Sequence, residues 1–311
     1  MAYTSGDTIL DDHYNGFVSD INTVIGTASG NYGWGQSTLS TVSAGSTITA
    51  TQWNTLLNQL EAAGSHTATS GVSFSTISTG DSITALSDIS TDITNITTNR
   101  GNLHAHGSDI TGSKNHTGSW STTLTFTSTI TFASDANAHE FFNAGGLIGV
   151  NFSTANTSGS KNTGWANLCS AVGTVWLTSA GPSGPATSVT LAGTSYQGCD
   201  KKGGSGSVTT ESNIGFHDLT GSNQETFKQF DATYLYTSNY IKINYKYASN
   251  VVTITVTCQD DANTTGWGGG STQDETVTAD INLTTTVRQP STTYISNSWG
   301  TPTVSVSSSA S

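Results

Sequence analysis

The chain has 311 residues, a formal net charge of −12 and only nine Lys and Arg residues. Binding to phosphate-rich partners needs clustered basic side chains, so neither nucleic acid nor an anionic lipid surface is an expected partner. No apolar run approaches the roughly 20 residues of a transmembrane helix, so membrane insertion is not expected either. Thr is the commonest residue, with 56 copies, and it favours strands over helices. The length favours about two domains.

The cysteines and the N-terminus indicate where the protein is made. Cys169, Cys199 and Cys258 are odd in number and form no Cys-x-x-Cys pair, so we expect buried free thiols, or at most one disulfide, rather than a disulfide framework or a zinc site. The first six residues lack the basic and apolar regions of a secretory signal. Together these features predict synthesis in a reducing cytoplasm.

Residues 7–62 predict a pair of helices. The first helix should end at Gly26, and the second opens with Thr49-Ala50-Thr51-Gln52, a capping-box pattern, and should end at Gly64. The first apolar stripe, at helical spacing, comprises Leu10, Tyr14, Phe17, Val18, Ile21, Val24 and Ile25. The second comprises Trp53, Leu56, Leu57 and Leu60. We interpret residues 1–64 as an attachment region whose candidate contact residues are Tyr14, Phe17, Trp34 and Trp53.

The connection between the two helices carries Tyr32-Gly33-Trp34-Gly35-Gln36. Glycines beside an aromatic residue let the backbone turn tightly while the ring packs. Two interpretations are open: a structural turn within the chain, or a knob that docks on a partner protein.

Residues 65–119 read as a linker followed by a short helical stalk. Leu86, Ile89, Ile93 and Ile96 recur at steps of three and four, the spacing of coiled-coil core positions. The residues between them are poor helix formers, so the helix needs a partner on its apolar side. That partner is either the chain's own domain or identical chains in a homo-oligomer, for which isoleucine at both core positions favours a trimer.

Three histidines lie just beyond the stalk. His104 and His106 form a His-x-His pair, and His116 follows ten residues later. In a three-fold bundle such a pair could surround a transition metal, whereas the simpler interpretation is a pair of surface histidines. We therefore predict no metal and no cofactor.

From about residue 120 the apolar period changes to two. Residues 241–247 and 252–258 alternate on either side of Ser249-Asn250, which predicts a β-hairpin. Further strands are expected near 124–132, 146–152, 172–178, 187–192, 276–287 and 301–307, with one short helix around Trp165. The predicted fold is therefore α+β and mainly β: a helical docking region (1–64), a linker and stalk (65–119) and an antiparallel β-sandwich or jelly-roll-like domain (120–311).

Motifs of catalysis are not recognisable. The glycine runs lack the strand-to-helix context of a phosphate loop, and no Gly-x-Ser-x-Gly elbow joins a strand to a helix. The five glutamates and sixteen aspartates are dispersed. Asp260-Asp261, beyond the hairpin, could contact a calcium ion but lack EF-hand spacing. We predict that the chain is not an enzyme.

The order of motifs resembles virion structural proteins of tailed bacteriophages, especially those of cyanophages. The segments that carry the likeness are Tyr32 to Gln36, Ile48 to Asn54, His139 to Gly146, Asn162 to Leu168, and Ile254-Thr255-Val256. The likeness spans most of the chain and implies a place in the virion, at the neck, tail, baseplate or fibre, with other virion proteins as partners. It carries no catalytic residues.

The expected function is that of an oligomeric appendage or adaptor anchored by its N-terminus. The alternatives are a carbohydrate-binding host adhesin or a capsid-decorating protein, and, third, an envelope depolymerase with two convergent carboxylates. An adhesin would have a host-surface glycan as partner, and aromatic side chains would anchor it. The candidates are Trp165, Tyr196, Tyr236, Trp267 and Trp299.

Overall fold

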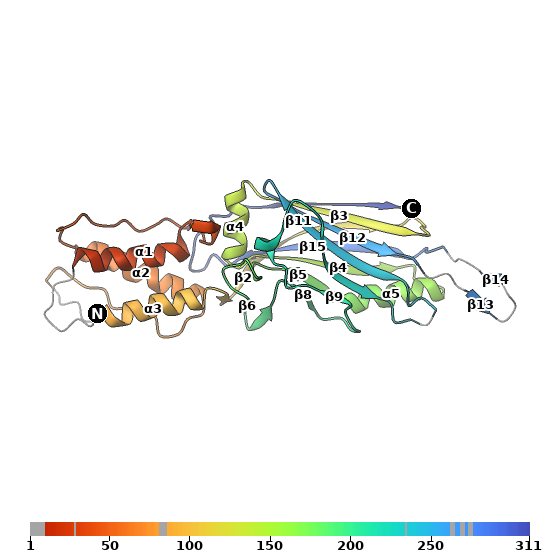
Figure 1. The fold of residues 1–311 in the computed structure, drawn as a ribbon, viewed down its shortest axis with the longest axis horizontal. Coiled ribbons are helices and arrows are strands. Elements are labelled where there is room, and N and C mark those ends of the chain that lie inside the picture. The colour runs from red at the N-terminus through yellow and green to blue at the C-terminus, as the bar shows by residue number, and fades with distance from the viewer. Residues whose placement is uncertain are drawn as a thin grey trace.

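A computed structural model describes residues 10–27, 29–80, 86–233, 235–261, 265–267, 271–272 and 276–311. The fold is α+β and mainly β, as the sequence predicts. A helical unit lies at one end of an elongated molecule, and two β-sheets extend from it along the long axis (Figure 1). None of the described helices is both long and apolar enough to cross a lipid bilayer.

The helical unit contains α1 (Asp11–Ile25), α2 (Ala50–His66) and α3 (Leu86–Thr98), with a short 3₁₀ turn, η1 (Ser29–Asn31), after α1. α1 stops before Gly26 as predicted, and Thr49 and Gln52 form the predicted capping box at the start of α2. The predicted end of α2 at Gly64 is wrong, because the helix continues to His66. Gly64 instead allows close packing, since an added Cβ there would lie 2.8 Å from Val72 Cβ.

The apolar side of α3 packs within the chain. Ile89, Ile93 and Ile96 are buried in a core shared with α1 and α2, whereas the side chain of Leu86 lies outside the described residues. The sequence left two partners open for this helix: the chain's own domain or identical chains. In the structure the helix packs against the chain's own domain. The expected stalk between identical chains is therefore not formed by these residues.

The β region consists of two antiparallel sheets that share a core. The six-stranded sheet has the order β16 (Thr303–Ala310), β3 (Thr123–Thr131), β12 (Val251–Gln259), β11 (Tyr240–Ala248), β10 (Gln224–Phe230) and β9 (Thr210–Glu211). The five-stranded sheet has the order β2 (His106–His116), β15 (Asp280–Pro290), β4 (Leu147–Ala155), β5 (Thr174–Leu177) and β8 (Cys199–Lys202). The hydroxyls of Ser128 on β3 and Thr285 on β15 meet at 2.6 Å, so the two sheets face each other.

The predicted hairpin is confirmed as β11 and β12. Ser249 and Asn250 between them have positive φ angles of 49° and 62°, which is the two-residue turn whose twist matches that of antiparallel strands. The other expected strands appear as β3, β4, β5, β6 (Val189–Leu191), β15 and β16. Short strands complete the set: β1 (Asn102–Leu103) pairs with β6 and β6 with β7 (Thr194–Tyr196), and β13 (Thr265–Trp267) pairs with β14 (Ser271–Thr272).

Two elements correct the sequence analysis. The sheet begins before residue 120, because β2 lies inside the expected linker and pairs along its length with β15. The β region also has a second helix, α4 (Asp135–Asn143), besides the expected one, α5 (Ser160–Val172). The hydroxyl of Ser134 caps α4 by accepting a hydrogen bond from the Asn137 amide. α4 stands where the helical unit meets the sheets, and α5 lies near their far end (Figure 1).

Candidate functional site

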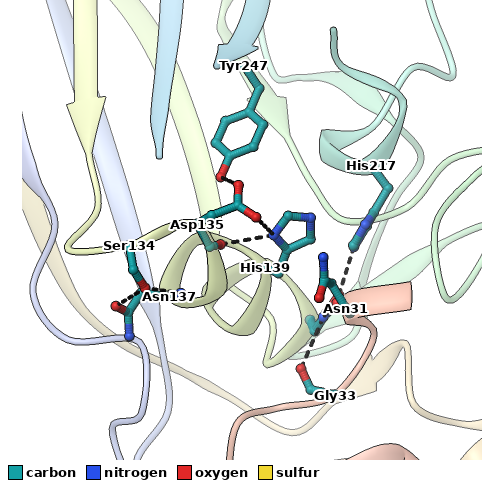
Figure 2. Close-up of polar contacts among 9 residues, drawn as sticks. Asn31, Gly33, Ser134, Asp135, Asn137, His139, His217 and Tyr247 are labelled. Carbon is teal, nitrogen blue, oxygen red and sulfur yellow. Dashed lines mark hydrogen bonds and ion pairs between the residues drawn. The ribbon is translucent and has the colours of Figure 1, made fainter. Parts of the chain in front are cut away.

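A group of polar side chains connects the helical unit to the sheets where the two meet. We call this region the joint and define it by residues 31–36, His66, α4, the 3₁₀ turn η2 (Phe216–Asp218), Tyr247 and residues 296–298. Figure 2 shows its central contacts.

Residues 34–36 complete the end of α1. The amide of Trp34 donates to Val24 O at 3.0 Å, the amide of Gly35 to Gly26 O at 3.0 Å, and the amide of Gln36 to Ile25 O at 2.7 Å. The last carbonyls of a helix have no partner within it. This segment therefore supplies the donors that α1 lacks.

The same loop is bound to the β region. The Tyr32 hydroxyl donates to Ser183 O at 2.7 Å. Gln36 donates to Ser296 O at 2.9 Å and accepts from the Ser296 amide at 2.8 Å, while Ser298 Oγ donates to Trp34 O at 2.6 Å. The loop is therefore a structural turn whose hydrogen-bond partners lie in the same chain, which is the first of the two interpretations given above.

Asn143, at the end of α4, links the β region to this loop. Its Nδ2 donates to Asn31 O at 2.6 Å and to Gly33 O at 3.0 Å, which fixes the orientation of the amide. Oδ1 must then accept, so the contact at 2.8 Å from His217 Nε2 identifies Nε2 as the protonated nitrogen (Figure 2). Burial lowers the pKa of His217 to about 4, so its imidazole is neutral near pH 7.

A second histidine completes the core of the joint. The rings of Trp34 and His66 lie 4.8 Å apart, edge to face, and both side chains are buried. His66 Nε2 contacts Ala144 O at 3.0 Å, so it carries a proton and donates. Burial lowers the pKa of His66 to about 4. Both histidines thus act as neutral hydrogen-bond donors.

Asp135, His139 and Tyr247 form the outer part of the joint (Figure 2). The Tyr247 hydroxyl donates to Asp135 Oδ1, and burial together with this bond raises the pKa of Tyr247. His139 Nδ1 lies 2.9 Å from Asp135 O and 3.7 Å from Asp135 Oδ2. Since a carbonyl oxygen can only accept, His139 is protonated at Nδ1.

In many hydrolases a histidine that is oriented by an aspartate acts as the general base. Such a base needs a nucleophile within hydrogen-bond reach. The neighbours of the His139 ring are instead aromatic: Phe216 at 5.0 Å, His217 at 5.4 Å and Tyr247 at 6.0 Å between centroids. Ser134, the hydroxyl nearest in sequence, is engaged in capping α4. The arrangement can position a helix, and as it stands it presents no activated nucleophile.

The candidate attachment residues lie inside the helical unit. Tyr14, Trp34 and Trp53 are buried and Phe17 is half-buried; the Trp53 ring lies 6.4 Å from Tyr14 and 6.5 Å from Phe17. These rings stabilise the unit internally. Attachment to a particle through its outer surface stays a prediction.

The candidate glycan anchors are also largely internal. Trp165, Tyr196, Tyr236 and Trp299 are buried, and the side chain of Trp267 lies outside the described residues. The described large apolar side chains that are exposed are Leu10, Leu235 and Tyr294. The four candidate anchors whose side chains are described are therefore core residues.

The three histidines that follow α3, His104, His106 and His116, do not lie close together. The His104 ring packs on Tyr294 at 4.9 Å, whereas His106 and His116 occupy opposite ends of β2. Within the residues that the structure describes, no three His, Cys, Asp or Glu side chains are placed to hold a metal ion. The three cysteines are free and buried, as expected, and burial raises the pKa of Cys169 and of Cys199 to about 12.

An open groove of about 260 Å³ lies beside α3. Its lining includes Phe74, Asp88 and Asp92. Burial, and then the charge of Asp88, raises the pKa of Asp92. The groove is smaller than a typical small-molecule site, and we assign it no ligand.

Sequence reasoning missed the joint. Its members Asn143, His217 and Ser298 are far apart in the chain, and none belongs to a motif with fixed spacing. The available signals were the segments Tyr32 to Gln36 and His139 to Gly146, which marked the loop and α4 without showing that they are partners. Comparison of the chain with protein-family models, with curated proteins and with solved structures gave no match.

Proposed function

We propose that the chain is a non-catalytic structural subunit of a tailed-phage virion, an oligomeric appendage or adaptor of the fibre, neck or tail. Its helical unit would anchor it to other virion proteins, and its β region would extend outward or pack on neighbouring subunits. The proposal starts from the resemblance of its motifs to such proteins and rests, in the structure, on the joint.

The joint supports a structural role because it connects the helical unit and the β region into one stiff body. The loop at 31–36 is tied to three separate segments of the β region, at Ser183, Asn143 and Ser296. Units that move independently usually share few such contacts across a flexible linker. A connection of this kind transmits position and force from one end of a rod to the other.

The proposed homo-oligomer, with a trimer favoured, needs a surface other than the α3 stripe. The outer edge of the five-stranded sheet is a candidate. β2 is an 11-residue strand with most of its side chains exposed, and among the described strands it pairs only with β15. β2 packs on β16 of the other sheet, but its outer edge has no hydrogen-bonded neighbour among the described strands. Such edges readily add a strand from another chain, so we place the contact with a second copy there.

The test is to locate the protein in particles. Purified virions produced from the genome that encodes the chain would be examined by mass spectrometry and by immuno-electron microscopy with antibodies against the full chain. We expect the protein in intact particles, with label at one repeated position. A protein found only in the lysate, and absent from washed particles, would contradict the proposal.

A further inference from the structure

A buried ion pair lies at the far end of the β region. Lys161 lies in the first turn of α5, and Asp260 directly follows β12. Lys161 Nζ is 2.6 Å from Asp260 Oδ2, and the two side chains are only 3% and 1% exposed. Sequence analysis considered Asp260 as a calcium contact, whereas the structure places it against an amine.

The surroundings hold the Asp260 backbone in place. The Asp260 amide donates to Thr122 O at 2.9 Å. Asn239 accepts from the Asp261 amide through its side chain at 2.9 Å and from the Asp231 amide through its backbone oxygen at 2.8 Å. Asp231 follows β10, Asn239 precedes β11 and Asp260 follows β12. Because these strands are antiparallel neighbours, all three residues lie at the same end of the sheet.

Asp231 brings a second buried carboxyl to this end. It is 5% exposed, and its Oδ1 accepts from the Thr233 amide at 2.8 Å. Its Oδ2 faces α5 at Gly164, where an added Cβ would lie only 2.8 Å away. Gly164 is three residues after Lys161, on the same side of the helix. Burial raises the pKa of Asp231.

The charged state of the Lys161–Asp260 pair is costly. Each buried ion loses several kcal/mol of hydration, which the mutual attraction offsets only in part. A cation in the first turn of a helix also opposes the helix dipole. Transfer of one proton makes both groups neutral, and a neutral amine held against a carboxylic acid is a pair of reactants in contact.

We propose that Lys161 and Asp260 condense to an intramolecular isopeptide bond, with Asp231 as the proton carrier. The Lys161 ammonium first passes a proton to the Asp260 carboxylate. The amine nitrogen then adds to Asp260 Cγ. Asp231 takes a proton from the nitrogen and passes it to the departing oxygen, so it ends as it began. The C–O bond breaks, one water leaves, and an amide joins Nζ to Cγ.

The balance of this reaction requires no oxidant, metal or co-reactant. In water, amines and carboxylic acids stay apart because their ions are well hydrated. In this interior the ions have lost that hydration, so a neutral amide relieves the cost of burial. The product would link the start of α5 covalently to the end of β12.

The chain contains a matched control pair. Lys202 Nζ lies 2.8 Å from Asp200 Oδ2, nearly the same distance, but these side chains are 35% and 17% exposed. Water stabilises both ions there. If proximity alone caused condensation, both pairs would react. If burial is required, only Lys161 and Asp260 react.

The test is the intact mass of the purified full chain under denaturing conditions, followed by peptide mapping. We expect a mass lower than the sequence mass by one water, and a branched tryptic peptide that joins Lys161 to Asp260. Lys161→Arg should restore the full sequence mass, whereas Lys202→Arg should still lose one water. Cleavage in the 203–206 loop should leave two fragments that stay joined on a denaturing, reducing gel.

An unmodified wild-type chain with the full sequence mass would overturn the bond, and this reading does not depend on any variant folding. Loss of water mapped to Lys202 and Asp200 would overturn the role of burial. Asp231→Asn should slow the appearance of the lighter species after synthesis at least tenfold. Formation at the wild-type rate in that variant, with an unchanged circular dichroism spectrum, would overturn the assignment of Asp231.

Discussion

The two helices of the β region, α4 and α5, are held in place by different chemistry. At the joint, the C-terminal end of α4 is fixed by neutral groups: Asn143 donates to two backbone carbonyls and accepts from His217, whose imidazole is uncharged near pH 7. At the far end, α5 is fixed by a lysine and an aspartate that are both almost fully buried.

The difference determines how each end responds to change. A neutral network spreads its bonds over several partners, so losing one bond leaves the others in place. A buried ion pair depends on both members, because removing one leaves an uncompensated charge. We therefore expect the far end to be the more sensitive of the two, and each prediction below tests that contrast.

The largest effect is expected for Lys161→Met, which removes the partner of Asp260, and with it the proposed cross-link, and leaves the Asp260 carboxyl buried alone. The free energy of unfolding, measured by urea denaturation, should fall by about 3–5 kcal/mol. The double variant Lys161→Met/Asp260→Leu should recover the part of that loss that the unpaired carboxyl causes, since no buried charge remains, but not the part that the cross-link contributes. Lys202→Met, at the exposed pair, should cost under about 1 kcal/mol. Equal losses for Lys161→Met and Lys202→Met would refute the contrast.

The next effect concerns the joint. Asn143→Ala removes the acceptor of His217 and the donor for Asn31 O and Gly33 O. We expect a loss of about 2–3 kcal/mol by urea denaturation, since these groups are left unsatisfied. Asn282→Ala is the control, because its amide bonds lie at the surface. A loss no greater than that of the control would show that the joint contributes little.

A smaller effect should appear as pH dependence. The folded-state pKa of His217 is lowered to about 4 from the usual 6.5. The unfolded chain therefore binds the proton first, and stability present above pH 6.5 is lost as the pH falls toward 4. For this partly exposed ring we expect on the order of 1–2 kcal/mol.

The matching variant is His217→Gln, whose amide can still donate to Asn143 but does not titrate. Thermal melts between pH 7 and pH 4 should show a shallower decline for His217→Gln than for wild type. His106→Gln, on the exposed end of β2, should leave the decline unchanged. Parallel declines in all three proteins would exclude His217 as a source of the pH dependence.

The smallest effect tests local helix capping, away from both ends of the sheet. Thr49→Ala removes the hydroxyl that accepts from the Gln52 amide. The expected loss is about 1 kcal/mol. Thr55→Ala, at an exposed position within α2, should be neutral or slightly stabilising because alanine is the better helix former. If both substitutions cost the same, the capping box has no role in stability.

Local patterns were predictable from the sequence. The turn at Ser249-Asn250, the capping box at Thr49 and the stop at Gly26 each depend on neighbours within a few residues, and the structure has all three. β2 was missed because its side chains are mostly exposed, so the strand has no apolar alternation to detect. α4 was missed because it is short and its partners are distant.

Chemistry that depends on distant residues was not predictable. Lys161 reaches Asp260 only because α5 packs at the end of three neighbouring strands. The apolar stripe of α3 was recognised from the sequence. Its packing partner, either the chain's own domain or a second copy of the chain, could not be determined from the sequence. Burial of Ile89, Ile93 and Ile96 against α1 and α2 depends on the tertiary fold.

The central claim is that the helical unit and the β region form one stiff rod through the joint. Small-angle X-ray scattering of the full chain, at concentrations where it is monomeric or of one defined oligomeric state, tests it most directly. We expect wild-type scattering to fit a single elongated body with the arrangement in Figure 1, and Asn143→Ala to broaden the distance distribution. A wild-type profile that requires an ensemble of bent arrangements would contradict the account.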